Sequence, residues 1–423
     1  MPEEIKYMRA LTTLLLSIIF TASFTCASMA NELVIATTFS PEATAHIISQ
    51  WQKQPQSIAV RTLNRTSSSL ERLLDTPMGE SIDLILTSSP MLMQHLQDHQ
   101  QLNPLPPLPR QNQQQLVPES IRNSTVAVAI SGYGILANSA RLKEKHLPTP
   151  TTWEGLKDAR YQGMILMSSP SRSDTNHLMI ETLLQERGWE QGWATLLEVS
   201  GNLATISSRS FGVSNKIKTG LGVAGPIIDN YATLLLKDPQ LTFSYFPQSG
   251  ASPTFIAITK NSAHQSDATR FIHFLLSDIG QQALSDTATG KYPVTPLPES
   301  DPRAKQQQRL LQQTPLDYRQ ILLRQQLVQQ LFDTAISFRL HQLQDAWKAL
   351  HNAETRLKRP LPEIRALLTA IPVSDRQATD TRYLSLFNQA KNTDNSQETE
   401  LMAWQQFFQQ QQYLAIQQLE SLK

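Results

Sequence analysis

Residues 164–178, MILMSSPSRSDTNHL, are an apolar run that stops abruptly in hydroxyl side chains and one arginine before a helical pattern begins. A helix start leaves backbone N–H groups without intrahelical partners, and the helix dipole adds partial positive charge there. Such a junction can hold an anion. The candidate ligand contacts here are Ser169, Ser171, Arg172, Ser173 and Thr175. The alternative is that Ser171 or Ser173 caps the helix and the rest forms a turn.

Similar junctions recur nearer the N-terminus. Three short apolar runs there are expected to be strands, and each is followed at once by small polar residues. The expected strands are 33–36, 58–62 and 84–86, and the polar segments after them are 37–40, 64–69 and 87–90. Because ligands bind outside the carboxyl ends of strands in open α/β sheets, these segments are expected to meet at one crevice. The candidate ligand contacts that they contribute are Thr38, Ser40, Arg65, Ser68 and Ser89.

Up to about residue 300, short apolar runs alternate with helical patterns, which predicts an α/β fold with largely parallel sheets covered by helices on both faces. The glycines of Ser131-Gly132-Tyr133-Gly134 permit a change of direction before a second set of strands. That set is expected at 163–167, 204–206, 221–224 and 241–246, with a return strand at 254–258. Two lobes with a hinge near Ser131 and Ser252 are therefore predicted: 31–131 with 252–300 as lobe 1, and 132–251 as lobe 2.

Residues 301–423 contain no glycine, are rich in glutamine and show a helical apolar period. A helix start is expected at Thr314-Pro315-Leu316-Asp317, with threonine as the cap and proline in the first helical position. Apolar seams follow at 336–357 and 401–422. The prediction is an antiparallel helical bundle with breaks near 360–362, 372–375 and 391–396.

The first thirty residues have the composition of a secretory signal peptide. Lys6 and Arg9 precede an apolar run from 11 to 24, and small residues precede Asn31, so cleavage after Ala30 and a periplasmic location are predicted. The only cysteine, Cys26, lies in this segment, which excludes disulfides and thiolate sites from the mature chain. No later run is apolar enough to insert into a membrane.

The charge balance and the lack of catalytic motifs argue against several classes of function. The balance of 37 Lys+Arg against 36 Asp+Glu argues against nucleic-acid binding. No metal-ligand spacing, nucleophile elbow or phosphate-binding Gly-Lys-Ser loop occurs, so no metal, no cofactor and no enzyme activity are predicted. Arg209 and Ser210 are candidate anion contacts, although Arg209 could instead form a surface ion pair. A secreted enzyme that acts on phosphate esters, and a purely structural interaction protein, remain as alternatives.

Several segments resemble a known family. Residues 152–163, 168–175 and 188–193 resemble the second domain of type II periplasmic solute-binding proteins, in the iron(III) and sugar-phosphate branch of ABC transporter binding proteins. Residues 208–215 and 220–229 look most like the binders of phosphorylated ligands. The resemblance implies two lobes that close on a small phosphorylated or carboxylated anion, phosphoglycerate-like or a sugar phosphate, with Asp229 at the site. The helical extension implies a partner in the inner membrane, either a sensor kinase or an ABC permease.

Two positions depart from that branch. Its ferric-binding members have adjacent tyrosines at the junction that corresponds to residues 229–231, whereas Tyr231 stands alone here. A single tyrosine gives poor support for an oxygen-rich iron site. We therefore expect that ferric iron is not the cargo, and we keep it only as an alternative ligand. The branch often has glycine where this chain has Asp174, and an acid beside a phosphate is unfavourable unless it points away or caps the helix.

Overall fold

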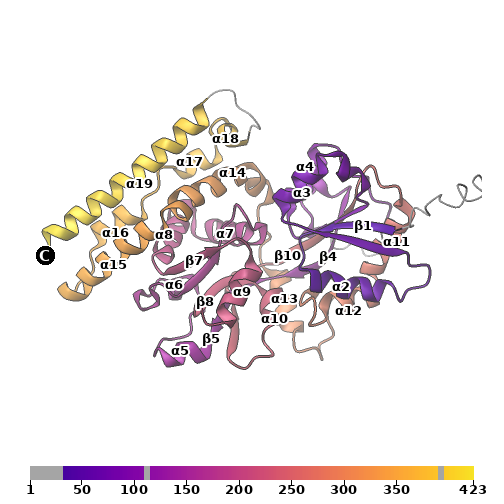
Figure 1. Ribbon diagram of the computed structural model, residues 1–423, viewed down its shortest axis with the longest axis horizontal. Coiled ribbons are helices and arrows are strands. Elements are labelled where there is room, and N and C mark those ends of the chain that lie inside the picture. Colours follow the sequence, from indigo (N-terminus) through magenta and orange to yellow (C-terminus); the bar gives the residue numbers. More distant parts are fainter. Residues whose placement is uncertain (1–31, 109–114, 389–394) are drawn as a thin grey trace, which may run out of the picture.

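The computed structural model describes residues 32–108, 115–388 and 395–423, so the predicted signal peptide lies outside the described residues. The chain forms two lobes, each built on one sheet (Figure 1). The sheet of lobe 1 has the order β11-β4-β10-β3-β1-β2, and that of lobe 2 has the order β7-β6-β8-β5-β9. The strands are β1 (Glu32–Thr37), β2 (Ala59–Asn64), β3 (Leu84–Thr87), β4 (Thr125–Ser131), β5 (Tyr133–Asn138), β6 (Ile165–Ser168), β7 (Leu203–Ser207), β8 (Ala224–Ile228), β9 (Leu241–Tyr245), β10 (Ser252–Ile258) and β11 (Tyr292–Pro293).

Both sheets are mixed, so the expectation of largely parallel sheets is wrong. β10 runs antiparallel to β3 and β4, and β5 runs antiparallel to β8 and β9. The reason lies in the crossings between the lobes. β5 and β10 each begin where the chain has just entered a different lobe, so no helical crossover within one sheet sets their direction.

One strand was placed wrongly from the sequence. The expected strand at 221–224 is a turn, and β8 begins only at Ala224. Gly220 has a φ of +78° there, and Leu221 is 60% exposed. A positive φ suits glycine and ends the preceding helix, so the apolar side chain of Leu221 lies in the turn before the buried strand.

Helices cover both sheets (Figure 1). Those that accompany lobe 1 are α2 (Pro41–Trp51), α3 (Ser67–Leu74), α4 (Pro90–Asp98), α11 (Gln265–Leu276) and α12 (Asp278–Ser285). Those of lobe 2 are α5 (Ser139–Glu144), α6 (Trp153–Leu156), α7 (Asp174–Arg187), α8 (Trp189–Ser200), α9 (Ser210–Lys218) and α10 (Asp229–Thr233). Short 3₁₀ turns are found at Pro77–Ser81, Glu119–Ile121, Ala159–Tyr161 and Ser337–Arg339.

The extension is helical, as expected, and its helices end near the predicted breaks at 360–362 and 372–375; residues 391–394 of the third break lie outside the described ranges. It consists of α13 (Ala304–Gln312), α14 (Tyr318–Ala335), α15 (Leu340–Leu357), α16 (Pro362–Thr369), α17 (Asp375–Thr379), α18 (Thr381–Asn388) and α19 (Ser396–Ser421). The predicted start at Thr314 is wrong. Asp317 is the cap instead, because its side chain accepts the Gln320 backbone N–H at 3.1 Å. The backbone N–H of Asp317 donates to Gln185 Oε1 at 3.0 Å.

The first helix of the extension packs away from the others. Leu310 of α13 is fully buried in the core of lobe 1, and its side chain occupies the space that a Cβ at Gly132 would need. The Gln307 amide donates to the Pro293 carbonyl at 2.7 Å, and its oxygen accepts the Leu297 N–H at 2.8 Å. α13 therefore belongs with lobe 1 and the region where the chain crosses between lobes.

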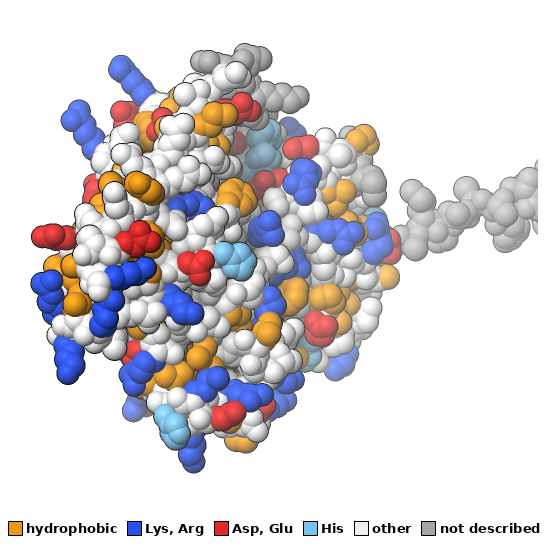
Figure 2. All heavy atoms as spheres, turned by 60° about the vertical axis from the view of Figure 1, so that its left-hand side comes forward, with side chains coloured by type: hydrophobic (Ala, Val, Ile, Leu, Met, Phe, Trp, Pro, Cys, Tyr) orange, Lys and Arg blue, Asp and Glu red, His pale blue; other side chains and the backbone are white. Residues whose placement is uncertain are grey.

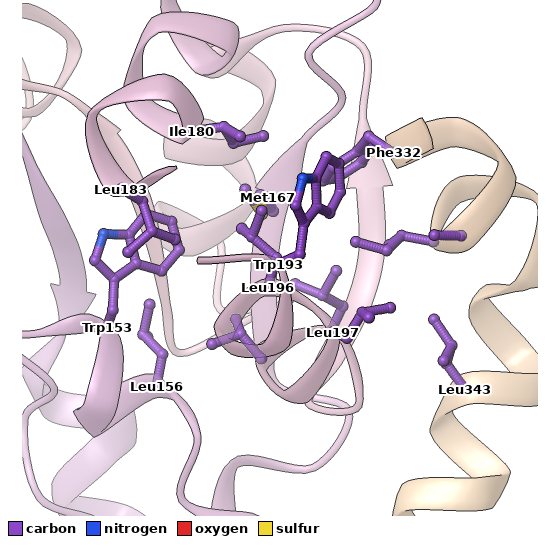
Figure 3. Close-up of a cluster of buried hydrophobic side chains, with 14 of the residues drawn as sticks. Trp153, Leu156, Met167, Ile180, Leu183, Trp193, Leu196, Leu197, Phe332 and Leu343 are labelled. Carbon is purple, nitrogen blue, oxygen red and sulfur yellow. The ribbon is translucent and has the colours of Figure 1, made fainter. Parts of the chain in front are cut away.

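The remaining helices share a hydrophobic core with lobe 2. Phe332 of α14 and Leu343 of α15 lie beside Trp193 and its neighbours on α8 (Figure 3). Gly201 is required where α15 passes, because a Cβ there would lie 2.5 Å from the Trp347 ring. Covering this much apolar surface is the main source of stability between packed elements. Helices α14 to α19 thus form a covering layer of lobe 2.

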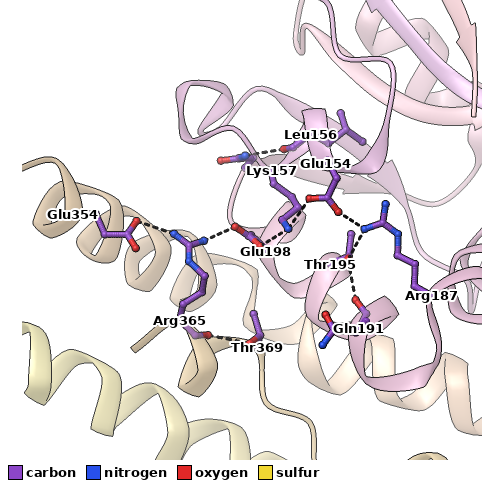
Figure 4. A network of polar contacts seen from close by, with 11 residues as sticks. Glu154, Leu156, Lys157, Arg187, Gln191, Thr195, Glu198, Glu354, Arg365 and Thr369 are labelled. Atoms are coloured by element: carbon purple, nitrogen blue, oxygen red, sulfur yellow. Dashed lines mark hydrogen bonds and ion pairs between the residues drawn. The ribbon is translucent and has the colours of Figure 1, made fainter. Parts of the chain in front are cut away.

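A polar network borders the same interface (Figure 4). Arg365 of α16 bridges Glu198 of lobe 2 and Glu354 of α15, and Lys157 joins Glu198 to Glu154 at 2.9 and 2.8 Å. Exposed ion pairs contribute little singly, whereas a network of partly buried ones fixes orientation. In the described ranges, none of the helices combines the length and the low polarity that a bilayer crossing needs.

Candidate ligand-binding site

A cavity of about 70 Å³ lies between the lobes where several helices begin. Ser40, Thr66 and Ser89 of lobe 1 line it, and they are the N-cap residues of α2, α3 and α4. Ser173 and Arg209 of lobe 2 also line it, at the starts of α7 and α9. Helix starts present unpaired N–H groups and partial positive charge. Five of them at one cavity supply the donors and partial positive charge that anion-binding sites use.

The capping hydroxyls remain able to donate to a ligand. Ser89 Oγ accepts the Leu92 N–H at 3.0 Å, and Ser173 Oγ accepts the Asn176 N–H at 3.4 Å. The alternative that Ser173 caps its helix is therefore correct. A capping oxygen uses one lone pair and keeps its proton for an acceptor, so the two roles are compatible.

The three polar segments after the lobe 1 strands do meet at this cavity. Thr38 Oγ1 lies 2.9 Å from Thr87 Oγ1, across the ends of two neighbouring strands. On the lobe 2 side, Ser210 Oγ lies 3.1 Å from Thr175 Oγ1. Of the thirteen residues proposed from the sequence, eight line the cavity: Thr38, Ser40, Ser89, Arg172, Ser173, Thr175, Arg209 and Ser210.

The other five do not line it. Arg65 and Ser68 are exposed, because α3 starts at Ser67 and its cap and first residue, Thr66 and Ser67, turn toward the cavity instead. The Arg65 guanidinium donates to the neighbouring Asn64 carbonyl at 3.0 Å. Arg65 and Ser68 therefore lie outside the cavity, and Thr66 and Ser67 line it in their place.

Ser169 and Ser171 point away from the cavity as well. Their hydroxyls donate to the carboxylate of Asp333 on α14, at 3.0 and 2.6 Å. The sequence could not show this, since the acceptor lies more than 160 residues further along the chain.

Asp229 lies behind the cavity, in the region of the chain crossings. Its carboxylate accepts the Gly132 N–H at 2.7 Å and the Tyr245 hydroxyl at 3.0 Å. Burial raises the pKa of Asp229 to about 7, and the hydrogen bond from Gly132 acts in the opposite direction. Its contacts join the start of α10 to β9 and to Gly132, which precedes β5, and it does not line the cavity.

The most buried cation of the site was missed by the sequence reasoning. Lys291, 3% exposed, lines the cavity with its Nζ 3.5 Å from Ser88 Oγ, 3.3 Å from Ser131 Oγ and 4.9 Å from the centre of the Phe39 ring. It forms no ion pair with a carboxylate in the described part of the chain. Burial lowers the pKa of Lys291 to about 8, although the charge of Asp229 acts to raise it.

Charge in the described lining is predominantly positive. Arg172 is exposed, Arg209 is half-buried with its guanidinium 5.4 Å from the Phe211 ring, and Lys291 is buried. The one carboxylate of the lining is Asp174. Asp174 occupies the first position of α7, where the helix dipole favours an acid. It lines the cavity, and the cap of the helix is Ser173. Asp174 Oδ2 is buried without a hydrogen-bond partner among the described residues.

Other lining residues were also missed. Besides Lys291, they are Phe39, Ala43, Thr66, Ser67, Thr87, Ser88, Phe211, Ile228, Asn230, Leu234 and Thr289. Asp174 and Tyr231, which the sequence singled out only as differences from the resembled family, line the cavity as well. The hydroxyl runs at 66–69 and 87–89 carried a signal for four of these. Tyr231 packs edge to face on Phe211 at 6.3 Å. No group of three or more His, Cys, Asp or Glu side chains that could hold a metal ion occurs in the described ranges.

Comparison with known sequences identifies a matching family and a similar protein. The family model for bacterial extracellular solute-binding protein matches residues 79–314. The phosphoglycerate transport regulatory protein PgtC of Salmonella typhimurium is 61% identical over 398 residues, which are 94% of this chain and 99% of that protein.

Solved structures share the fold. The substrate-binding protein of an ABC transporter from Agrobacterium tumefaciens superposes with a TM-score of 0.58 at 16% identity, over 69% of this chain and 88% of that one. The periplasmic binding protein AfuA from Actinobacillus pleuropneumoniae, with exogenous fructose-6-phosphate bound, superposes with a TM-score of 0.57 at 16% identity. The match covers 75% of this chain and 98% of that one. The predicted two-lobed fold with a helical extension is confirmed. Since the family model covers more than half of the sequence and the curated relative nearly all of it, this chain belongs to the bacterial extracellular solute-binding proteins.

Proposed function

We propose that this protein captures a small phosphorylated or carboxylated anion in the periplasm and presents it to a membrane partner. The observation that carries the proposal is the convergence of five helix starts and the buried Lys291 on one cavity between the lobes. Each helix start contributes N–H donors and partial positive charge, and Lys291 adds a full charge in a setting that excludes water. A compact anion satisfies all of these groups at once.

A phosphate ester is the chemistry that suits the lining best. It offers three acceptor oxygens and about two negative charges at neutral pH, which matches donors that come from both lobes. The printed name of the Salmonella relative refers to phosphoglycerate, and the AfuA structure holds a sugar phosphate. Both support a ligand that carries a phosphate group on a short hydroxylated skeleton.

Capture would proceed by closure of the lobes about the chain crossings. Ser131 and Ser252 pair across the end of the lobe 1 sheet, and the Tyr133 hydroxyl lies 2.8 Å from Ser252 Oγ. Few chain segments connect the lobes here, so small changes of φ and ψ can swing one lobe against the other. The chain belongs to a family of solute-binding proteins, so the ligand is expected to be released unchanged.

Calorimetry of the mature chain with 3-phosphoglycerate, glycerate, inorganic phosphate and ferric citrate tests the proposal. We expect 3-phosphoglycerate to bind and, at one hundred times its Kd, to stabilise the fold by about 2.7 kcal/mol. Glycerate should bind more weakly because it lacks the phosphate charge. Ferric citrate should give no visible tyrosinate band, since the lining offers Tyr231 without an adjacent tyrosine. Heat from ferric citrate alone, with a band that Tyr231→Phe removes, would favour the iron-binding alternative.

The partner is proposed to be a sensor kinase or ABC permease in the inner membrane. The support comes from the outer face of the extension, where Phe338 and Tyr413 are 68% and 66% exposed beside the glutamines of α19. On the face shown in Figure 2, small apolar areas are scattered among charged and uncharged polar side chains. A surface of this kind suits a transient complex better than a permanent one.

Replacing both aromatic side chains tests this partner surface. The Phe338→Ser/Tyr413→Ser variant should bind 3-phosphoglycerate as the unaltered protein does, because neither residue lines the cavity, yet it should lose the uptake or signalling response in cells. Ile279→Ser removes a half-exposed apolar side chain from lobe 1 and serves as the matched control. A normal cellular response of the double variant would contradict the assignment of this surface.

A further inference from the structure

Asp333 of the extension gathers three hydroxyl donors. Its Oδ1 accepts from Ser169 Oγ at 3.0 Å and from Ser337 Oγ at 2.6 Å, and its Oδ2 accepts from Ser171 Oγ at 2.6 Å. Hydrogen bonds to an ionised acceptor are shorter and stronger than neutral ones. The carboxylate therefore fastens the loop between β6 and α7 to the C-terminal end of α14.

That loop carries part of the lobe 2 side of the ligand cavity. Ser169 Oγ accepts the Ser171 N–H at 3.2 Å, and the Ser169 carbonyl accepts the Arg172 N–H at 3.2 Å. The next residues, Arg172 and Ser173, line the cavity. The orientation of Ser169 thus sets the path of the backbone into the ligand contacts, and Asp333 sets the orientation of Ser169.

α14 is held against lobe 2 along its whole length. Near its start, Asp317 exchanges hydrogen bonds with Gln185 of α7, and in its middle Arg324 pairs with Glu181 of the same helix. Phe332, next to Asp333, is fully buried beside Trp193 (Figure 3). The order of these contacts shows that α14 runs antiparallel to α7, so Asp333 approaches the ligand end of α7 from a rigid support.

We propose that Asp333 is a positioning residue of the ligand site, through which anion binding in the cleft is coupled to the packing of the helical extension. The inference rests on the proposed function, because the coupling is measured at the anion site. Coupling is reciprocal: if Asp333 improves the geometry for the anion, the bound anion must in turn favour the packed state of α14. Ligand occupancy would thereby reach a domain that is itself remote from the cleft.

The direction in which Asp333→Asn changes the Kd distinguishes a positioning role from a pure charge effect and from a purely structural role. Asp333→Asn removes a negative charge from the helix that packs beside the anion site, so charge alone predicts unchanged or tighter binding. A purely structural role predicts a lower Tm with an unchanged Kd. A positioning role predicts weaker binding, by about tenfold, because the amide cannot accept all three hydroxyl protons and the loop loses its fixed geometry.

The experiment measures the Kd for 3-phosphoglycerate on the full mature chain by calorimetry, with hydrogen exchange of residues 169–175 and 330–338. Asp333→Asn should weaken binding about tenfold and speed exchange of the loop. In the wild type, the anion should slow exchange at 330–338, and in the variant it should not. Asp345→Asn, an exposed carboxylate on α15, is the matched control and should change neither.

A second variant keeps the test decisive. Ser169→Ala/Ser171→Ala should weaken binding as Asp333→Asn does, and combining the two changes should add little, because they remove the same contacts. Additive losses, or a Kd of Asp333→Asn equal to or below that of the wild type, would overturn the inference. If the wild type binds neither 3-phosphoglycerate nor phosphate, the proposed function itself fails, which is a different result.

Discussion

Lys291→Met is expected to weaken the binding of 3-phosphoglycerate by about 2 to 5 kcal/mol, the range found when one member of a buried charged contact is truncated. Lys291 is the only cation of the described lining that is fully buried, so its charge acts on the anion with little screening. Methionine keeps the length and the apolar stem. Calorimetry should show the loss as roughly a 30-fold or greater rise in Kd.

The pH profile provides a second measurement of the same contact. The phosphate monoester gains its second charge near pH 6, so affinity should first rise with pH. Because burial lowers the pKa of Lys291 to about 8, the ammonium is lost above that pH, and affinity should fall there by up to about tenfold per unit. The charge of Asp229 already contributes to this pKa. The bound anion raises the pKa of Lys291 in the complex, so the fall should end once the pH exceeds that higher value. In Lys291→Met the fall should be absent.

Folding is not expected to suffer from this substitution. Burying an ammonium that has no carboxylate partner costs free energy of desolvation, and methionine avoids this cost, so the Tm of the ligand-free variant should be at least that of the wild type. Lys260→Met, at an exposed position of lobe 1 outside the cavity, is the control. An unchanged Kd for Lys291→Met would place the ligand elsewhere.

Arg324→Met is expected to lower the free energy of unfolding by about 3 to 5 kcal/mol, the largest stability effect that we expect from any single substitution here. Arg324 is 2% exposed and pairs with the fully buried Glu181, with Nε 3.0 Å from Oε1. Its guanidinium also lies 5.0 Å from the centre of the Trp189 ring. Removing it leaves the Glu181 carboxylate buried between α7 and α14 with only His177, whose Nε2 lies 3.8 Å from Oε1, as an ion-pair partner among the described residues. Chemical denaturation should show the loss as a lower midpoint.

The double variant distinguishes a lost charge partner from lost packing. Glu181→Met combined with Arg324→Met removes both charges, so it should recover most of the stability that the single change costs. If the double variant is as unstable as the single one, the Arg324 side chain acts mainly by packing against Trp189. Arg376→Met, at an exposed position on α17, is the control for the loss of a surface cation.

Local patterns in the sequence predicted the parts of the site that local structure creates. Thr38 and Ser89 were found because each directly follows a buried strand, and the carboxyl ends of neighbouring strands meet at one edge. Ser173 was found because hydroxyl side chains cap helices. The helix breaks beside Pro360 and Pro372 follow from the loss of a backbone donor at proline.

Local patterns also misled where two neighbouring positions compete. At 65–68 the sequence predicts Arg65 and Ser68 as contacts. The structure instead places Thr66, the cap of α3, and Ser67, its first residue, in the lining and leaves Arg65 and Ser68 exposed. The choice depends on the residue at which α3 begins, and helix boundaries are the least certain feature of a sequence pattern.

Only the tertiary structure decided where Ser169, Ser171 and Lys291 belong. The two serines turn to Asp333 because α14 packs against α7, and the surroundings of Lys291 come from Phe39, Ser88 and Ser131, which lie far apart in the chain. A short stretch of sequence sets backbone conformation, strand ends and caps, because these depend on a few neighbouring residues. The burial of a charge and the partner of a hydroxyl depend on segments that meet only after the lobes and the extension have packed.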